Sequence, residues 1–211
     1  MILDLLKGLG VSAELSFLTL LFALPLGLAI EFGRMPKNPF VSQIFRIYIS
    51  IMRGTPLMLQ LLFVYFGPYY IFRISLSGYS PFVGAVVAFS LNYAAYFAEI
   101  YRAGILSIDC GQYEAAEALG LGKVRTFFYI IFPQVVKRIL PPVTNEVITL
   151  VKDTSLAFTL SVMEMFTVAK MAAAAHTTMV PLIAAGAFYY IFNYLVAWAM
   201  EALERHFSYY N

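Results

Sequence analysis

Long apolar runs recur along this chain of 211 residues and limit what it can fold into. A helix needs about 20 apolar residues to cross the hydrocarbon core of a bilayer, which is about 30 Å thick. Runs close to or above that length occupy residues 11–31, 45–72, 82–104, 134–151 and 181–203, and a further apolar but interrupted stretch covers 155–178. The pattern predicts an all-α integral membrane protein with about five core transmembrane helices and one broken or re-entrant segment.

The composition supports a membrane protein. Hydrophobic residues make up 61% of the chain and charged residues 12%, whereas about 25% of the residues of a soluble domain are charged. The single cysteine, Cys110, excludes an internal disulfide. No small-residue cleavage motif follows the first apolar run, so we expect an uncleaved span and no signal peptide. We expect residues 1–211 to form one membrane domain, and the net charge of +2 gives no reason to expect a nucleic-acid partner.

Basic residues near the ends of the predicted spans indicate the orientation, because Lys and Arg accumulate on the cytoplasmic side. With five spans, one side receives Arg34, Lys37, Arg46, Arg102, Lys123, Arg125, Lys137, Arg138 and Arg205. The other side receives Lys7, Arg73 and Lys170. We therefore expect the N-terminus outside and the C-terminus in the cytoplasm. Residues 155–178 are expected not to cross fully, since a sixth span would place Arg205 outside.

The stretch GQYEAAEALGLGKVRTFFYIIFPQ, residues 111–134, is unusually polar for this chain. Asp109 and Gln112 have the spacing of a capping box and predict the start of a helix. Gly120 and Gly122 predict its end, because glycine readily adopts the left-handed conformation that terminates helices. A helix of about two to three turns is too short to be stable alone in water. It must therefore pack against another part of the chain or against a partner.

The residues of this short helix favour a docking surface for a protein partner. Its alanines leave little side-chain bulk, so another backbone can approach closely. Leu119 offers one apolar anchor, and Glu114 and Glu117 offer polar contacts. The alternative is an amphipathic helix that lies on the bilayer surface, for which bulky apolar residues and lysines are more typical than alanines and glutamates.

Several motifs, in order along the chain, resemble one protein family. The segment EAAEALG (114–120), followed after nine residues by IIFP (130–133), is similar to the EAA loop of the membrane subunits of ATP-binding-cassette (ABC) importers. Phe132 stands where that loop usually has leucine, which keeps the position apolar. Four further segments resemble the polar amino acid permeases among these importers, namely RGTP (53–56), AYFAEIYRAGI (95–105), GQYEAA (111–116) and VKDTSL (151–156). The resemblance covers most of the chain, from about residue 11 to residue 207.

The resemblance implies a permease subunit of a bacterial inner membrane, with a cytoplasmic coupling helix in a loop of about residues 106–133 between the third and fourth spans. The coupling residues that match the family are Glu114, Ala115, Ala116 and Gly120, and Leu119 is added from its placement. The implied partners are an ABC ATPase, a second permease subunit and an extracytoplasmic amino-acid-binding protein. ATP and Mg belong to the ATPase in this scheme, since this chain has no G-x-x-x-x-G-K-[ST] phosphate loop. The chain itself is expected to hold no cofactor and to be no enzyme.

Polar side chains inside the spans indicate a functional site or a structural pair, because an unpaired charge there costs roughly 3 kcal/mol on insertion scales. Arg53 precedes a kink expected at Pro56; it could act as a conformational pivot, contact a substrate carboxylate, or pair with an acidic side chain of its own chain. Asn92, Tyr96 and Glu99 lie on one face of the third span. Asn92 is the candidate for a ligand contact, and Glu99 is expected to pair with Arg102.

The stretch VKDTSLAFTLSVMEMF, residues 151–166, interrupts the apolar pattern with polar residues. Transporters use such broken helices to bind substrate at membrane depth. An amino acid presents an ammonium and a carboxylate, so Asp153 or Glu164 is a candidate acceptor, and Ser155 and Asn92 are candidate donors. A further acidic residue facing the cavity would favour a cationic substrate such as arginine, lysine or histidine. The alternative is that Asp153 pairs with the adjacent lysine or with a neighbouring subunit.

Two other functions compete with an importer subunit. An ion-coupled secondary amino acid transporter would share the broken helices and buried charges, but it should show an internal repeat, and the sequence shows none. An integral-membrane enzyme needs a cluster of catalytic residues, and the two histidines, His176 and His206, are about 30 residues apart. Copurification with an ATPase would distinguish the importer from both.

Overall fold

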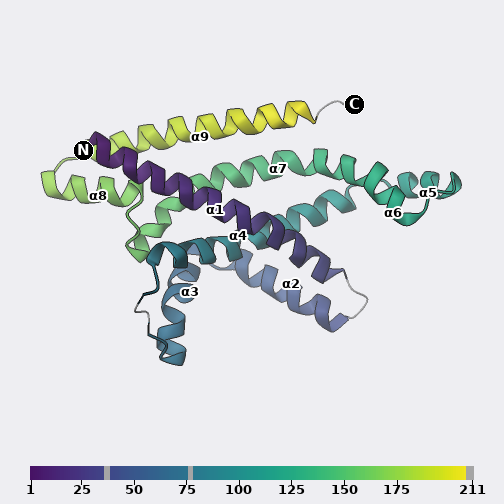
Figure 1. The fold of residues 1–211 in the computed structure, drawn as a ribbon, viewed down its shortest axis with the longest axis horizontal. Helices are drawn as coiled ribbons and strands as arrows, with labels where there is room; N and C mark the ends of the chain where they lie inside the picture. Colours follow the sequence, from purple (N-terminus) through teal and green to yellow (C-terminus); the bar gives the residue numbers. More distant parts are fainter. Residues whose placement is uncertain (36–38, 76–77, 208–211) are drawn as a thin grey trace.

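The computed structural model describes residues 1–35, 39–75 and 78–207, and every element within these ranges is helical. In chain order the elements are α1 (Ile2–Arg34), α2 (Pro39–Gly54), α3 (Leu57–Phe72), α4 (Pro81–Leu106), α5 (Cys110–Ala118), α6 (Lys123–Thr126), the π-helix η1 (Phe127–Ile131), α7 (Phe132–Asp153), the 3₁₀-helix η2 (Thr154–Leu160), α8 (Met165–His176) and α9 (Val180–His206). The N-terminus and α8 lie at one end of the molecule, α5 and α6 lie at the other, and α9 runs from the first end towards the second (Figure 1).

The described helices provide up to five candidate membrane spans. Helices α1, α4 and α9 are each long and apolar enough to cross a bilayer alone. Two bent pairs supply the others: α2 with α3, bent by 114°, and Lys123–Leu160 with α8, bent by 57°. The predicted all-α membrane fold is confirmed. The predicted broken segment is found in η2 and α8, which are separated by a turn at Ser161 with a φ of 60°.

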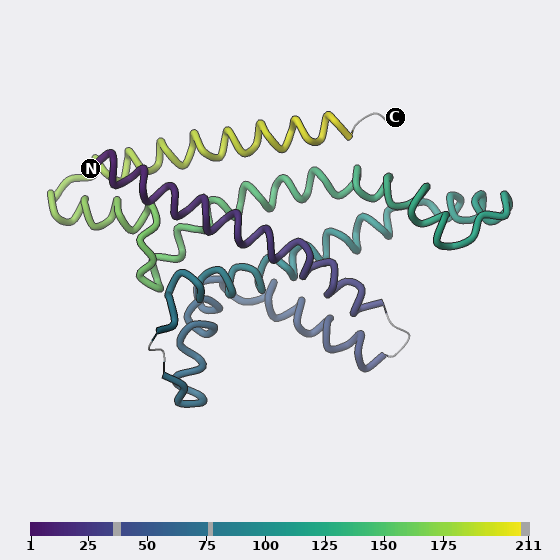
Figure 2. Tube along the Cα trace, in the orientation of Figure 1, coloured from purple at the N-terminus to yellow at the C-terminus, as the bar shows by residue number. Residues whose placement is uncertain are grey.

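The second apolar run differs from the prediction. Residues 45–72 are expected to form one span with a kink, but α2 ends at Gly54 and α3 begins at Leu57 after a change of direction of 114°. Pro56 is extended, with φ −62° and ψ 130°, and proline has no N–H with which to continue the hydrogen bonds of α2. Figure 2 shows α3 leaving the other helices at this turn.

Small residues let α1 approach its neighbours closely. A Cβ added at Gly27 would lie 2.9 Å from the Ala94 carbonyl oxygen of α4, and one at Gly8 would lie 2.7 Å from the Cα of Met165 in α8. The main core then joins α1, α3, α4, α7 and η2 through buried side chains that include Leu15, Leu61, Phe89, Tyr93, Phe97, Leu150 and Leu160. This packing encloses α4, whereas α9 remains largely exposed.

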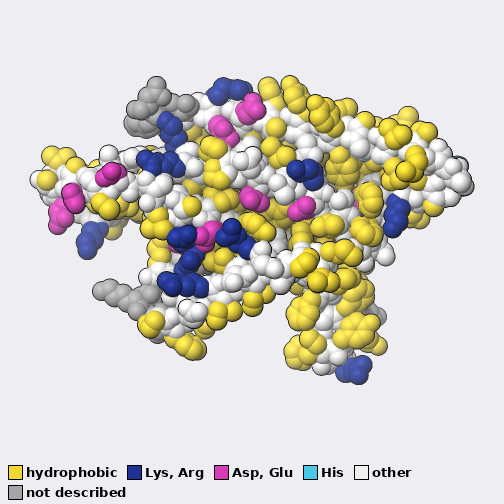
Figure 3. Space-filling model, turned by 180° about the vertical axis from the view of Figure 1, so that it is seen from behind, with side chains coloured by type: hydrophobic (Ala, Val, Ile, Leu, Met, Phe, Trp, Pro, Cys, Tyr) yellow, Lys and Arg dark blue, Asp and Glu magenta, His cyan; other side chains and the backbone are white. Residues whose placement is uncertain are grey.

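Charged side chains gather over the half of the molecule that ends in α5, as the view from behind shows (Figure 3). Arg102 lies near the end of α4 and Lys123 begins α6, whereas Lys7 and Lys170 lie in α1 and α8 at the opposite end. Lys37, which also contributes to the predicted orientation, lies outside the described residues. The N-terminus and α5 lie at opposite ends of the molecule (Figure 1).

Candidate coupling surface and translocation cavity

The predicted short helix is present as α5, and its N-terminal cap is the predicted residue. The Asp109 carboxylate accepts a hydrogen bond of 2.7 Å from the backbone N–H of Gly111. The predicted capping box also requires the side chain of Gln112 to return to the backbone of the cap. In the structure this side chain instead accepts a hydrogen bond from Gln134. Asp109 is therefore confirmed as the N-cap, but the capping box is not formed: Asp109 binds the N–H of Gly111, and the side chain of Gln112 contacts α7.

The C-terminal end of α5 is a Schellman motif. Gly120 has a φ of 73°, its N–H donates to the Glu117 carbonyl at 2.9 Å, and the Leu121 N–H donates to the Ala116 carbonyl at 3.0 Å. These two bonds satisfy carbonyl groups that a helix end would leave free. The second predicted stop, Gly122, has a φ of −68° and is the N-cap of α6. Gly120 is therefore the residue that ends the helix.

The surface of α5 is open. The helix lies at the far end of the molecule (Figure 1), and Glu114, Ala115 and Gly120 are exposed. Leu119 is 78% exposed, whereas Ala116 is 1% exposed. An exposed leucine beside alanines and a glutamate forms a small apolar patch with a polar rim. We call residues 114–120 the coupling surface, after the role that the resemblance implies.

A cavity of about 170 Å³ lies where the α2–α3 turn, α4 and α7 meet. It is lined by Thr55, Leu57, Asn92, Tyr93, Tyr96, Glu146, Thr149 and Asp153. Two of the predicted substrate residues, Asn92 and Asp153, are thus brought together although they are far apart in the sequence. We call this space the inner cavity.

A second cavity of about 350 Å³ continues from the inner cavity along α4 and α7. Tyr96 and Glu146 line both spaces. The second cavity also contains Arg53 from the end of α2 and Arg138 from the beginning of α7. Together the two cavities form a groove, lined by both charged and apolar side chains, that leads from the α2–α3 turn towards the end of α4 that precedes α5.

Asp153 and Asn92 are held by different partners. The Tyr93 hydroxyl donates a hydrogen bond of 2.8 Å to Asp153 Oδ2. Asn92 is 4% exposed, and its Nδ2 donates to Gln60 Oε1 at 2.9 Å and to the Met52 carbonyl at 3.1 Å. Gln60 Nε2 in turn donates to the Met52 carbonyl and to Thr55. Asn92 therefore fastens the α2–α3 turn to α4, and its carboxamide donor is already used.

The structure places the other two predicted substrate residues elsewhere. The Ser155 hydroxyl donates to the Lys152 carbonyl at 2.8 Å, and neither Ser155 nor Glu164 lines the groove. Glu164 is 0% exposed and is the N-cap of α8, where it accepts from the N–H groups of Phe166 and Thr167 at 2.6 and 2.7 Å. Its carboxylate stabilises a helix start and does not face the groove.

Arg53 and Glu99 also differ in their contacts. Glu99 binds Arg102, as predicted, and also Arg34 at 2.7 Å. Arg53 makes no ion pair within 4.0 Å among the described residues; its guanidinium lies 5.5 Å from the centroid of the Tyr96 ring. The expected pairing of Arg53 with an acidic side chain is therefore not formed in this conformation.

The sequence analysis did not single out four residues that build the groove and its supports: Gln60, Tyr93, Glu146 and Thr149. One signal was available for Glu146, because it precedes Asp153 by seven residues and so shares its helix face. Gln60 and Tyr93 are recognised through contacts between helices that are distant in the sequence. Among the described residues, no group of three or more His, Cys, Asp or Glu side chains could hold a metal ion.

The family described as the inner membrane component of binding-protein-dependent transport systems matches residues 23–209. The chain belongs to this family. The match spans both the groove and the coupling surface of the permease, and it confirms the resemblance drawn from the motifs.

Relatives of the permease include components of amino acid transport systems. The octopine transport system permease protein OccM of Rhizobium radiobacter is 38% identical over 210 residues, which cover 95% of this chain and 84% of OccM. The L-cystine transport system permease protein TcyB of Bacillus subtilis is 38% identical over 94% of this chain and 84% of TcyB. The putative glutamine transport system permease protein GlnP of Rickettsia conorii is 34% identical over 94% of this chain and 90% of GlnP.

Solved structures share the fold of the permease. A crystal structure of an amino acid ABC transporter with histidines matches with a TM-score of 0.88 and 30% identity, over 96% of this chain and 94% of that chain. The inward-facing MetNI methionine ABC transporter matches with a TM-score of 0.73 over 99% of this chain and 96% of that chain. At 16% identity, the second likeness shows the fold alone.

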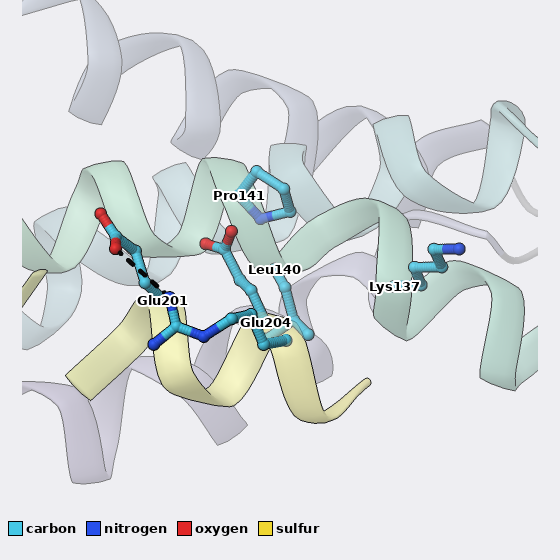
Figure 4. Close-up of a pocket in the computed structure, with 6 residues that line it drawn as sticks. Lys137, Leu140, Pro141, Glu201 and Glu204 are labelled. Carbon is cyan, nitrogen blue, oxygen red and sulfur yellow. Dashed lines mark ion pairs between the residues drawn. The ribbon is translucent and has the colours of Figure 1, made fainter. Parts of the chain in front are cut away.

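One further hollow of the permease, of about 320 Å³, lies between α7 and α9 (Figure 4). It is lined by Lys137, Leu140, Pro141, Glu201, Glu204 and Arg205. Arg205 pairs with Glu201 at 3.7 Å, and the Thr144 hydroxyl of α7 donates to Glu204. The hydrogen bond from Thr144 to Glu204 joins α7 to the end of α9, whereas the Arg205–Glu201 pair lies within α9. The hollow shares no lining residue with the groove.

Proposed function

We propose that the permease carries an amino acid with a cationic side chain, such as arginine, lysine or histidine, into the cell. The observation that carries this proposal is the pair of carboxylates, Glu146 and Asp153, that line the inner cavity. Seven residues are about two helical turns, so both project from the same face of α7. A carboxylate within a span requires a partner. One can bind the substrate α-ammonium group while the other binds the side-chain cation.

Both the names of the relatives and the residues of the inner cavity support an amino acid substrate. OccM, TcyB and GlnP are named for transport of octopine, cystine and glutamine, and a similar transporter was crystallised with histidines. In this chain Asp153 keeps a ligand-binding role in the proposal, and Asn92 shapes the cavity by holding the α2–α3 turn. Ser155 and Glu164 have no part in it, because neither lines the groove.

The energy for transport comes, in this proposal, from a separate ABC ATPase that binds ATP and Mg and docks on the coupling surface. Leu119 is the apolar anchor, Glu114 and Ala115 supply exposed contacts, Ala116 supports the helix from its buried side, and Gly120 ends it. The permease needs no cofactor of its own. An extracytoplasmic amino-acid-binding protein would deliver substrate at the opposite end, where the N-terminus and α8 lie (Figure 1).

A second permease subunit is needed to complete the path. Glu146, Thr149 and Asp153 lie on a groove that is open in the single chain. Carboxylates facing lipid would be costly, so a second copy or a close relative must cover this side. The complex would lie in a bacterial inner membrane with its N-terminus outside and its C-terminus in the cytoplasm. Closure of the ATPases would move the coupling surfaces and expose the groove alternately to each side.

The test is ATP hydrolysis and amino acid uptake by the permease reconstituted in liposomes with its ATPase and binding protein. We expect arginine to stimulate hydrolysis and to accumulate, and citrulline, its neutral analogue of similar size, to do neither. Equal stimulation by both amino acids would remove the cationic preference. Arginine uptake without an ATPase, driven by an ion gradient, would show a secondary transporter instead.

A further inference from the structure

Arg53 occupies a position suited to a cation of the substrate. It lies at the end of α2, beside the 114° turn, and its guanidinium lies 5.5 Å from the centroid of the Tyr96 ring. Arg53, Tyr96 and Glu146 line the same cavity, and Arg53 interacts electrostatically with Glu146. An aromatic face beside a carboxylate is a favourable site for guanidinium and ammonium groups. The side chain therefore rests in a cation site formed by α4 and α7.

Arg53 is bound more weakly than the other charged side chains of the groove. Glu99 is bound by both Arg34 and Arg102, and Arg138 donates to a backbone carbonyl at the end of α4. Arg53 is exposed, and among the described residues it makes no ion pair within 4.0 Å. A side chain held by a cation–π contact and a more distant carboxylate can be displaced by a competing cation.

We propose that Arg53 is a tethered competitor, which fills the cation site of the empty permease and is displaced by the cationic group of the substrate. The inference rests on the proposed function and names a residue that sets affinity for cations. Tyr96 and Glu146 line both cavities. A substrate cation that enters the inner cavity therefore meets the same two side chains that line the second cavity together with Arg53. The two cations exclude one another, so substrate binding is a competition within the groove.

Removing the charge of Arg53 should strengthen the binding of cationic amino acids and leave the binding of neutral amino acids unchanged. Arg53→Gln is expected to lower the Kd for arginine by about threefold to tenfold, the range for losing a partly exposed cation–π competitor. The Kd for citrulline should hardly change, because a neutral side chain does not compete for the site. Arg53→Lys keeps the competing cation and should bind arginine like the wild type. Arg46→Gln is the matched control, since Arg46 is an exposed arginine of the same helix and lines neither cavity.

The measurement is calorimetric titration of arginine and citrulline into the intact permease–ATPase complex in lipid nanodiscs without nucleotide. Unchanged or weaker arginine binding by Arg53→Gln, or an equal gain for citrulline, would overturn the inference. A wild type that binds neither amino acid would overturn the proposed function instead. Thermal unfolding of each complex checks assembly, and Arg53→Met, which keeps an apolar stem against Tyr96, repeats the test if Arg53→Gln does not assemble.

Discussion

Helix α5 and the inner cavity lie in different parts of the permease and are assembled in different ways. The hydrogen bonds that cap α5 at both ends all join residues within 109–121. Most of the other residues of the helix are exposed. The inner cavity draws residues from the α2–α3 turn, from α4 and from α7. Local hydrogen bonds specify the first region, whereas packing between helices that are distant in the sequence specifies the second.

The two regions should therefore fail in different ways when they are altered. A change on the exposed face of α5 removes a surface for a partner and leaves the packing of the spans intact. A change at the inner cavity alters a site that three parts of the chain build together, and its effect depends on which contacts of α4 and α7 are lost. Each of the following variants separates these two outcomes.

The largest effect is expected from removing both charges of the inner cavity. Glu146→Gln with Asp153→Asn should reduce the affinity for arginine by about 100-fold or more, since hydrogen bonds to charged groups contribute about 1.5–3 kcal/mol each. Assembly with the ATPase should persist, because α5 is untouched. Titration of arginine into the complex measures the loss. Glu201→Gln on exposed α9 is the control, and an equal loss in that variant, or none in the double variant, would contradict the assignment of the cavity.

Leu119→Asp should act on the other region alone. Leu119 is 78% exposed, so a charge there costs the isolated permease little, but burial against an ATPase would become unfavourable. Truncation of a central anchor typically costs about 2 kcal/mol or more, which corresponds to a docking affinity weakened by about 30-fold. Size-exclusion chromatography and surface plasmon resonance with the ATPase measure this loss. Leu119→Met keeps the anchor apolar and should dock normally; unchanged docking by Leu119→Asp would leave α5 as a helix of the bilayer surface.

The features that could be predicted from the sequence are those specified by residues close together in the chain. Asp109 and Gly120 were recognised as the ends of α5 because capping depends on residues only a few positions away. The helical nature of the spans followed from the length of the apolar runs. The pairing of Glu99 with Arg102 followed from their spacing of three residues on one helix. Each of these features depends on chain neighbours.

The features that were missed depend on neighbours in space. Gln60 is recognised through its contacts with Asn92 and the α2–α3 turn, and the size of that turn does not follow from Pro56 alone. Glu164 was taken for a ligand because an acidic residue in an apolar stretch suggests function. The structure uses it as a helix cap, a position for which Ser, Thr, Asp and Asn are the usual residues.

Gly120→Ala should give a smaller effect and tests the conformation at the end of α5. Gly120 has a φ of 73°, and an added Cβ would meet no atom within 4 Å, so the penalty is that of the left-handed backbone, about 1–2 kcal/mol. Docking of the ATPase should weaken by no more than about fivefold to 30-fold. Gly122→Ala is the matched control, because its Cβ also meets open space but its φ is −68°. The two variants therefore differ in backbone strain and not in crowding; equal effects would mean that Gly120 is required for space around a docked partner.

The smallest effect is expected from Ser155→Ala. The Ser155 hydroxyl donates to the Lys152 carbonyl at 2.8 Å and lines neither cavity, so arginine binding should be nearly unchanged. Tyr93→Phe provides the comparison, because it removes the hydrogen bond of 2.8 Å to Asp153, worth about 1 kcal/mol, and should weaken binding by about fivefold. A loss in Ser155→Ala that exceeds the loss in Tyr93→Phe would mean that η2 turns its hydroxyl into the groove when substrate binds. The cavity would then be built partly from the broken segment, and its assembly would depend on the substrate as well as on the packing of α4 and α7.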